Sequence, residues 1–337
     1  MRPGAVAALA GDASGNSGLM RPAPAPAVPD LAALWTAAMR RGDMAGAWAL
    51  SDAVLAARDP ARRDDPRLPY HERWVWDGRD FTGRHVLVRC YHGLGDSLQF
   101  LRLLPLLRGR VASLAVEVQP DLLALLADLP GPDRLIPFRP EAPAPPVECD
   151  IESMELAHAL RIAPASLPPV PYLGVPTGRI TAARARLATA RIGLCWRAGD
   201  WDPGRSVPLR LLARACAAPG RRFVSLQRGP AAEEAAAPQF VNPRDRCRDV
   251  VETAALIMAL DLVITVDTMV AHLAGALGRP AWLLLQADAD WRWMTGRPDS
   301  PWYPSMRLYR QRVAGDWRHP LACLAADLKR RMEQPDA

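Results

Sequence analysis

The stretch HVLVRCYHGLGDSLQFLRLLPLL, residues 85–107, decides the fold. It opens on an apolar run of the length of a buried strand, and a helical pattern follows within a few residues. A buried strand that passes directly into a helix is typical of a parallel βαβ unit. The apolar positions that give the helical spacing are Leu98, Leu101, Leu104 and Leu107.

Two glycines and an aspartate separate the predicted strand from the predicted helix. Ligands of open α/β sheets bind outside the carboxyl ends of the strands, where glycines let the backbone approach. We therefore interpret Gly93 and Gly95 as opening a turn that aims Asp96 into a cleft. A helix cap formed by Asp96 explains the same pattern, and both interpretations stay open. A nicotinamide site is disfavoured because the glycines do not complete G-x-G-x-x-G.

A second strand–helix junction lies in LDLVITVDTMVAHLAGALGRPAWLLL, residues 260–285. The predicted strand ends at Asp267, and the predicted helix runs to a Gly-Arg-Pro stop signal. The amides of Thr268, Met269 and Val270 would lie in its first turn, where they could receive phosphate oxygens. The alternative is a helix cap with His272 as a core histidine.

Two further predicted strand ends carry polar residues. The loop in RIGLCWRAGDWDPGRSVPL contains Arg197 and Arg205, whose guanidinium groups could neutralise a diphosphate or could be solvated. Gln227 ends the strand in FVSLQRG, and Glu233 or Glu234 could bind ribose hydroxyls or form an exposed helical turn.

Composition excludes several classes of protein. The net charge of +6 comes almost wholly from scattered arginines, with Lys329 the only lysine. Without a basic block or base-stacking motif, nucleic-acid binding is not predicted. No apolar run reaches the roughly 18 residues of a membrane span, so we predict a cytoplasmic protein and leave peripheral membrane contact open. The six cysteines include no C-x-x-C pair, and most of them are interpreted as small core residues in a reducing compartment.

The sequence divides into four segments. Residues 1–29, rich in Ala, Gly and Pro, are predicted to be a disordered tail. Residues 30–70 are predicted to begin with a helical hairpin that resembles one degenerate tetratricopeptide unit. Alternating strands and helices then predict a Rossmann-like acceptor domain at 71–175 and a Rossmann-like donor-nucleotide domain at 176–337. A Pro-rich stretch links these two domains.

Other kinds of site lack their local signatures. No cluster has metal-ligand spacing, and neither a G-x-S-x-G elbow nor a Walker A sequence occurs. The aromatic residues Trp291, Trp293 and Trp302 are predicted to pack in the core, because large aromatics mostly contribute buried area. Lining a donor pocket is the alternative for them.

Taken together, these stretches resemble the bacterial heptosyltransferase-like glycosyltransferases, glycosyltransferase family 9. Within that family the chain is most similar to the branch in which tetratricopeptide repeats precede the transferase portion. The resemblance implies the GT-B fold, with two facing doubly wound domains. It further implies metal-independent transfer of a sugar, with inversion, from a nucleotide-sugar donor to a hydroxyl of a glycan or protein, without a further cofactor. Besides the stretches quoted above, it rests on WDGRDFTGR at residues 76–84 and DWRWMTGRPDSPWYPSMRLYRQ at residues 290–311.

The resemblance also implies roles for individual residues. Asp96 matches the acidic residue of the N-terminal glycine loop and would be the general base. Arg205 matches a basic residue that steadies the donor diphosphate, so both are predicted catalytic residues. The predicted donor-binding set comprises Gly93, Gly95, Arg197, Gln227, Asp267, Thr268, Met269, Val270 and His272.

One departure from the family pattern keeps other functions open. Related sequences often have Glu-Gln where this chain has Tyr91 and His92, so the acceptor side differs. A catalytically silent module that binds a sugar nucleotide on the same fold is therefore the main alternative. A nucleotide-sugar epimerase is a third, although its carboxylate and histidine pattern is not recognisable.

Overall fold

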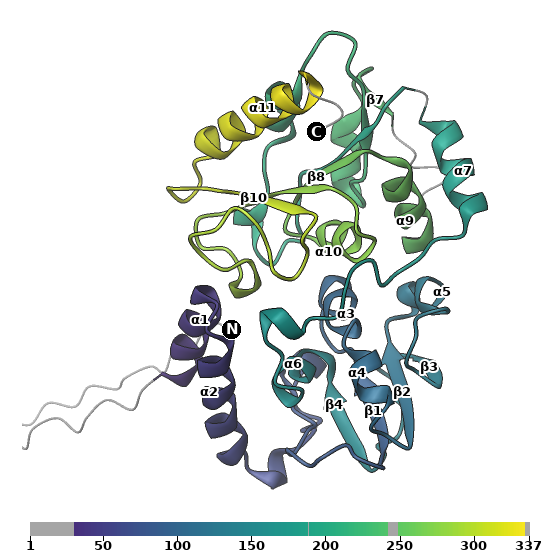
Figure 1. Ribbon diagram of the computed structural model, residues 1–337, viewed down its shortest axis with the longest axis vertical. Helices are drawn as coiled ribbons and strands as arrows, with labels where there is room; N and C mark the ends of the chain where they lie inside the picture. The colour runs from purple at the N-terminus through teal and green to yellow at the C-terminus, as the bar shows by residue number, and fades with distance from the viewer. Residues whose placement is uncertain (1–29, 188, 242–248, 334–337) are drawn as a thin grey trace, which may run out of the picture. The chain divides into compact units, whose positions relative to one another are not determined.

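The computed structural model describes residues 30–187, 189–241 and 249–333, and Figure 1 shows two parallel sheets with helices beside them. Nearly all of the described chain, from Leu31 onward, belongs to one compact unit. The tail predicted for residues 1–29 lies outside the described residues, as does Cys247. Of the other cysteines, Cys323 is exposed and the remaining four are buried.

The first sheet has four parallel strands in the order β3-β2-β1-β4. β1 lies in the apolar run that opens residues 85–107, and it is buried at every position except its first residue. Burial on both faces is the usual state of a parallel strand. The strands are β1 His85–Arg89, β2 Ser113–Val118, β3 Arg134–Pro137 and β4 Cys149–Glu152, and the helices between and after them are α3 Leu94–Leu101, α4 Leu104–Arg108, α5 Leu123–Leu126 and α6 Leu156–Ala159.

The helix predicted after β1 is divided in two. α3 ends at Leu101, and α4 begins at Leu104 with Pro105 in its first turn. Proline has no backbone N–H to donate and its ring crowds the preceding turn, so an uninterrupted helix across this point is disfavoured. The four predicted leucines are nevertheless all buried, so the apolar face continues across the break.

The second sheet has six parallel strands in the order β10-β9-β8-β5-β6-β7. β5, β6 and β8 lie in strand stretches predicted from the sequence, whereas β7, two residues long, leaves no period to detect. The strands are β5 Ile192–Cys195, β6 Phe223–Ser225, β7 Phe240–Val241, β8 Leu262–Val266, β9 Ala281–Leu285 and β10 Met306–Arg310, and the helices are α7 Thr177–Arg186, α8 Leu209–Cys216, α9 Val250–Ala259, α10 Met269–Ala276 and α11 Arg318–Glu333.

Two helices, α1 (Leu31–Arg41) and α2 (Met44–Ala56), form a hairpin in the segment before the first sheet. Asp43 caps α2 by accepting a hydrogen bond from the Gly46 amide at 2.8 Å. The hairpin is built into the molecule, since the indole of Trp48 donates to the Ile162 carbonyl at 2.7 Å and Arg40 pairs with Asp288 at 2.7 Å. It therefore contacts both the segment after α6, in the first α/β region, which is built on the first sheet, and the loop after β9, in the second α/β region, which is built on the second sheet (Figure 1).

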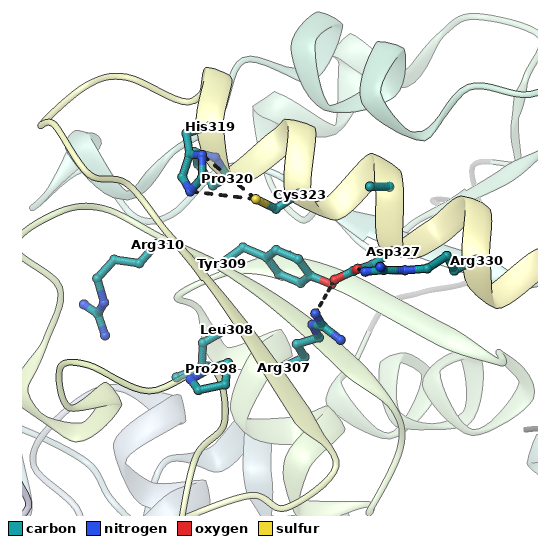
Figure 2. Close-up of a pocket in the computed structure, with 11 residues that line it drawn as sticks. Pro298, Arg307, Leu308, Tyr309, Arg310, His319, Pro320, Cys323, Asp327 and Arg330 are labelled. Atoms are coloured by element: carbon teal, nitrogen blue, oxygen red, sulfur yellow. Dashed lines mark hydrogen bonds and ion pairs between the residues drawn. The ribbon is translucent and has the colours of Figure 1, made fainter.

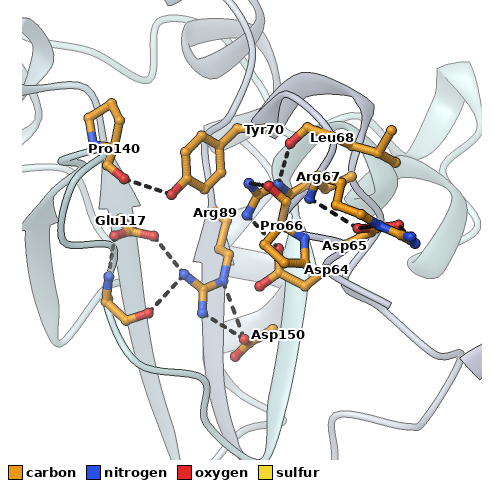
Figure 3. Close-up of polar contacts among 12 residues, drawn as sticks. Asp64, Asp65, Pro66, Arg67, Leu68, Tyr70, Arg89, Glu117, Pro140 and Asp150 are labelled. Carbon is orange, nitrogen blue, oxygen red and sulfur yellow. Dashed lines mark hydrogen bonds and ion pairs between the residues drawn. The ribbon is translucent and has the colours of Figure 1, made fainter. Parts of the chain in front are cut away.

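A buried charge network crosses the first sheet (Figure 3). The guanidinium of Arg89 on β1 donates to Glu117 on β2 at 2.8 Å and to Asp150 on β4 at 2.8 Å. Side-chain exposure of all three is 3% or less. The remaining carboxylate oxygens accept from the amides of Ala144 and Val147, which ties the Pro-rich loop before β4 to the sheet. Each charge in this network therefore has hydrogen-bonding partners, as burial requires.

The strand order of each sheet indicates which strand ends favour ligand binding. β1 lies between β2 and β4, and β5 lies between β6 and β8, so the winding of each sheet reverses beside these strands. Ligands of open α/β sheets bind at such switch points. Asp96 follows β1, Arg205 follows β5 and Asp267 follows β8. Three predicted site residues thus lie where the fold favours a ligand.

Helices α3 and α10 pack directly against each other, and Gly95 lies at their contact. A Cβ atom at this position would stand 2.7 Å from Cδ2 of His272. Neither Gly95 nor Gly93 has a positive φ. Gly93 and Gly95 therefore do not serve a left-handed backbone conformation, and at Gly95 the missing side chain is what lets α10 approach.

Replacing Gly95 by alanine is expected to lower the free energy of unfolding by about 1–3 kcal/mol, because a methyl group would overpack this contact. Gly178→Ala is the matched control, since a Cβ there meets open space. That helical substitution should be neutral or stabilising by about 0.5–1 kcal/mol. Urea denaturation of both variants measures the difference, and equal stabilities would contradict the close contact.

Candidate active site

Asp96 is fixed by two hydrogen bonds, one to each carboxylate oxygen. Oδ2 accepts from the Gly93 amide at 3.0 Å, which closes the first turn of α3. Oδ1 accepts from Nη2 of Arg292 at 2.7 Å. The cap interpretation is therefore confirmed, and Asp96 also pairs with a cation that follows β9 of the second sheet.

Arg292 is a site residue that sequence reasoning missed. It lies in a 3-10 turn, Trp291–Trp293, that Asp290 caps through the Arg292 amide. Its guanidinium is 9% exposed and also lies 3.3 Å from Oδ2 of Asp290. The only available signal was an arginine between two tryptophans in a stretch that otherwise reads as core.

The junction of β8 and α10 has the predicted strand–turn–helix form. Thr268 caps α10, and its Oγ1 accepts from the Val270 amide at 3.2 Å. The prediction that the Val270 amide is free for phosphate is therefore wrong, because the cap already uses it. Met269 is the first residue of α10. His272 is buried, with Nδ1 3.1 Å from the Tyr303 hydroxyl and Nε2 3.9 Å from Asp267.

Arg205 connects the loop after β5 to the turn after β8. Its Nη1 donates to the backbone carbonyl of Asp267 at 3.0 Å, and its side chain is 12% exposed. The ring of Trp201, an exposed residue, lies 4.1 Å from the guanidinium carbon. Arg197 differs, being 52% exposed and no closer than 3.8 Å to a carboxylate. The structure thus brings Arg205, rather than Arg197, to the predicted diphosphate turn.

The side-chain amide of Gln227 forms hydrogen bonds with backbone groups. Its Oε1 accepts from the amides of Trp196 and Arg197 at 3.1 and 2.9 Å, and its Nε2 donates to two backbone carbonyls. In this arrangement Gln227 shapes the loop after β5. Glu234, one of the two predicted ribose ligands, accepts from the indole of Trp196 at 3.2 Å.

Burial and charge set the protonation of the cluster around Arg292. Burial alone would raise the pKa of Asp96, but the charge of Arg292 and smaller contributions from His272, His92 and the Gly93 amide bring that pKa below its ordinary value. Burial raises the pKa of Asp267 to about 6 and lowers the pKa of His272 to about 3. At neutral pH, Asp96 is therefore ionised and His272 is neutral.

The two residues that depart from the family pattern have different environments. Tyr91 is buried against Tyr70 and Phe138, with ring centroids 4.9 and 5.3 Å away. His92 is partly exposed, and its Nε2 lies 3.8 Å from Glu152 at the end of β4. Burial raises the pKa of Glu152 to about 8. The departure therefore places one core aromatic residue and one accessible imidazole beside the α3 N-terminus.

The tryptophans behave as packing residues. Trp293 and Trp302 are fully buried, and Trp291 packs partly buried against the same core, so the packing interpretation is confirmed. Within the described ranges, no group of three or more His, Cys, Asp or Glu side chains could hold a metal ion. None of the helices that the structure describes is long and apolar enough to cross a membrane.

A cavity of about 350 Å³ lies elsewhere, between β10 and α11 (Figure 2). Its carboxylate, Asp327, accepts from the Tyr309 hydroxyl at 2.9 Å and pairs with Arg307 at 2.6 Å and with Arg330. These charged groups are thus satisfied by one another, and none of the predicted site residues lines the cavity. We place the candidate site at the carboxyl ends of β1 and β8, because the buried groups with shifted pKa values, Asp96, Asp267 and His272, lie there.

Comparison with known proteins agrees with this architecture. The chain is 18% identical to the ADP-heptose lps heptosyltransferase II of E. coli, with a TM-score of 0.54 over 75% of this chain and 100% of that one. It is 12% identical to a glycosyl transferase family 9 protein from Veillonella parvula, with a TM-score of 0.56 over 76% and 98% of the two chains. The chain has the GT-B fold. The predicted fold is thereby confirmed.

Sequence comparison alone does not assign the chain to a family. No family model matches the chain. Protein FlbA of Caulobacter vibrioides is 28% identical over 306 residues, which cover 80% of this chain and 50% of FlbA. The chain therefore spans about half the length of this curated relative.

Proposed function

We propose that the protein is an inverting, metal-independent glycosyltransferase that moves a sugar from a nucleotide-sugar donor to a hydroxyl of a glycan or protein. One observation carries the proposal: Asp96, at the start of α3, pairs with Arg292, which also interacts with Asp267 in the turn before α10. The carboxylate that we propose as proton acceptor is thus close to the turn that we propose for the diphosphate. A cytoplasmic location is part of the proposal.

Asp96 would act as the general base. An alcohol is a weak nucleophile near neutral pH, so a carboxylate beside it must take its proton as the glycosidic bond forms. The acceptor oxygen bonds to the anomeric carbon, the bond from that carbon to the diphosphate breaks, and the nucleoside diphosphate leaves with the electron pair. Attack from the face opposite the leaving group gives inversion.

The leaving diphosphate would be stabilised by Arg205 and the N-terminus of α10. The guanidinium of Arg205 already lies against the Asp267 carbonyl, and Met269 opens the helix. An arginine fork and a helix N-terminus both favour phosphate oxygens. They supply the positive charge, so the proposed step includes no metal ion. The ADP-heptose in the name of the E. coli protein of the same fold supports a nucleotide sugar as donor class.

A catalytically silent sugar-nucleotide module is the second candidate. It is favoured by one observation, that Asp96 is held in an ion pair with Arg292, which lowers its basicity. Such a module would bind the donor and not release nucleotide.

Incubation of the protein with ADP-, GDP- and UDP-sugars separates the two candidates. Donor binding is measured by calorimetry, and nucleotide release and sugar incorporation are measured with a cell-extract glycan and protein fraction as acceptor. The transferase predicts binding with acceptor-dependent release. Binding without release indicates the silent module, and the absence of binding to every donor contradicts both.

Arg205→Ala is expected to weaken binding of the nucleoside diphosphate about 10- to 100-fold, since a hydrogen bond to a charged group contributes roughly 1.5–3 kcal/mol. Arg210→Ala removes the same charge from an exposed position of α8 and should leave affinity nearly unchanged. Calorimetric titration at low and moderate salt compares them. Unaltered affinity in Arg205→Ala would remove this residue from the phosphate site.

A further inference from the structure

The state of Asp96 in this structure conflicts with its proposed task. A general base must take the proton of the acceptor hydroxyl, and an ion pair with a guanidinium makes a carboxylate less basic. Both oxygens of Asp96 are engaged, one by the Gly93 amide and one by Arg292. The bond to Gly93 belongs to the first turn of α3 and lasts as long as that turn does. The bond to Arg292 joins separate parts of the chain, so it is the one that another ligand could replace.

The guanidinium of Arg292 has one N–H donor that no described residue accepts from. Nη2 serves Asp96 and Nη1 lies 3.3 Å from Asp290, while the buried Nε has no hydrogen-bond partner among the described residues. A buried donor without a partner is costly, so this nitrogen would gain from an acceptor that a ligand supplied. A guanidinium presents donors in a planar fork that matches the oxygens of a phosphate. The ring of Trp291, 5.0 Å from the guanidinium carbon, limits its movement on one side.

We propose that Arg292 is a donor-responsive positioning residue, which holds Asp96 in an ion pair while the donor site is empty and turns to the diphosphate when the donor binds. Oδ1 of Asp96 then no longer pairs with a cation, so it becomes more basic and can take the proton of the acceptor hydroxyl. This inference depends on the proposed transferase function, because it names the order in which that site is made ready. It makes the base available only when a sugar is present to receive the acceptor oxygen.

The titratable and charged groups around the Asp96–Arg292 pair determine whether donor binding raises or lowers the pKa of Asp96. His92 and His272 face Asp96, and Asp290 and Asp267 face Arg292. Burial acts to raise the pKa of Asp96, and the charge of Arg292 is the largest influence that lowers it. Since His272 is neutral, it does not replace that charge when Arg292 turns away. Donor binding should therefore raise the pKa of Asp96, and the protein should take up protons on binding at acid pH.

Proton uptake can be measured without any turnover. The titrant is whichever of ADP, GDP or UDP binds, added by calorimetry at pH 4 to 6 in buffers of different ionisation enthalpy. The proton uptake of Asp96→Asn reports the phosphate groups and all other sites. We expect the wild-type protein to take up a larger fraction of a proton than Asp96→Asn, and this excess to be small in Arg292→Gln. Arg292→Lys keeps the charge and should retain part of the excess.

Each outcome of this experiment either supports or overturns the proposed role of Arg292. Equal uptake by wild-type protein and Asp96→Asn, with nucleotide binding intact in both, would overturn it while leaving the proposed function standing. An excess as large in Arg292→Gln as in the wild type would also overturn it, because the diphosphate would then act on Asp96 directly. If Arg292→Gln does not fold, Arg292→Lys and the comparison of wild type with Asp96→Asn still decide. Failure of every nucleotide to bind would instead count against the proposed function.

Discussion

Replacing Asp96 by asparagine is expected to lower kcat about 10²- to 10⁴-fold, the usual contribution of a positioned general base. Asparagine has nearly the same shape and can still accept a hydrogen bond from Arg292, so nucleotide affinity should change little. The acid limb of the pH–rate profile should disappear from the residual activity, because wild-type turnover falls as Asp96 becomes protonated. Initial rates of nucleotide release from pH 4 to 8 measure both effects.

Asp128→Asn is the matched control for that experiment. Asp128 is an exposed carboxylate of the same α/β region, outside the candidate site. Its replacement should leave kcat and the pH profile as they are. Unchanged turnover in Asp96→Asn would remove Asp96 from the mechanism, whatever the control does.

The second large effect concerns stability. Arg89→Met is expected to lower the free energy of unfolding by about 3–5 kcal/mol, because Glu117 and Asp150 would be left buried without their cation. A loss of this size is a large part of the roughly 5–15 kcal/mol that holds a typical domain folded. Urea denaturation at neutral pH measures it.

Two further variants identify the cause. Arg84→Met removes an exposed arginine just before β1 and should cost little, since surface substitutions usually lie within about 0.5 kcal/mol. Combining Arg89→Met with Glu117→Gln and Asp150→Asn should recover part of the lost stability, because no buried charge then remains. A single Arg89→Met variant as stable as Arg84→Met would show that the network contributes nothing.

Most strands could be predicted from the sequence because they are buried on both faces. A run such as Leu262–Val266 has few polar residues to obscure its pattern, and all five of its residues are buried. The break between α3 and α4 was foreseeable from Pro105 but was not predicted, since the apolar spacing continues through it. β7 was beyond reach because two residues carry no period.

The candidate site was only partly predictable. Asp96 stood out because it follows a strand and two glycines, and local pattern suffices for such a residue. Arg292 did not, because its role depends on a partner 196 residues away along the chain. Two other features depend on packing and capping geometry in the same way. Gly95 leaves space for His272, and Thr268 uses the Val270 amide. Sequence spacing does not contain them.

The central claim is that a nucleotide-sugar donor binds at the carboxyl ends of β5 and β8. Amide hydrogen exchange, measured with and without the nucleoside diphosphate, tests it most directly. We predict that exchange slows in residues 196–206 and 266–273, which include Arg205 and the N-terminus of α10. Protection confined to other segments, such as β10 and α11 around the separate cavity, would contradict the account.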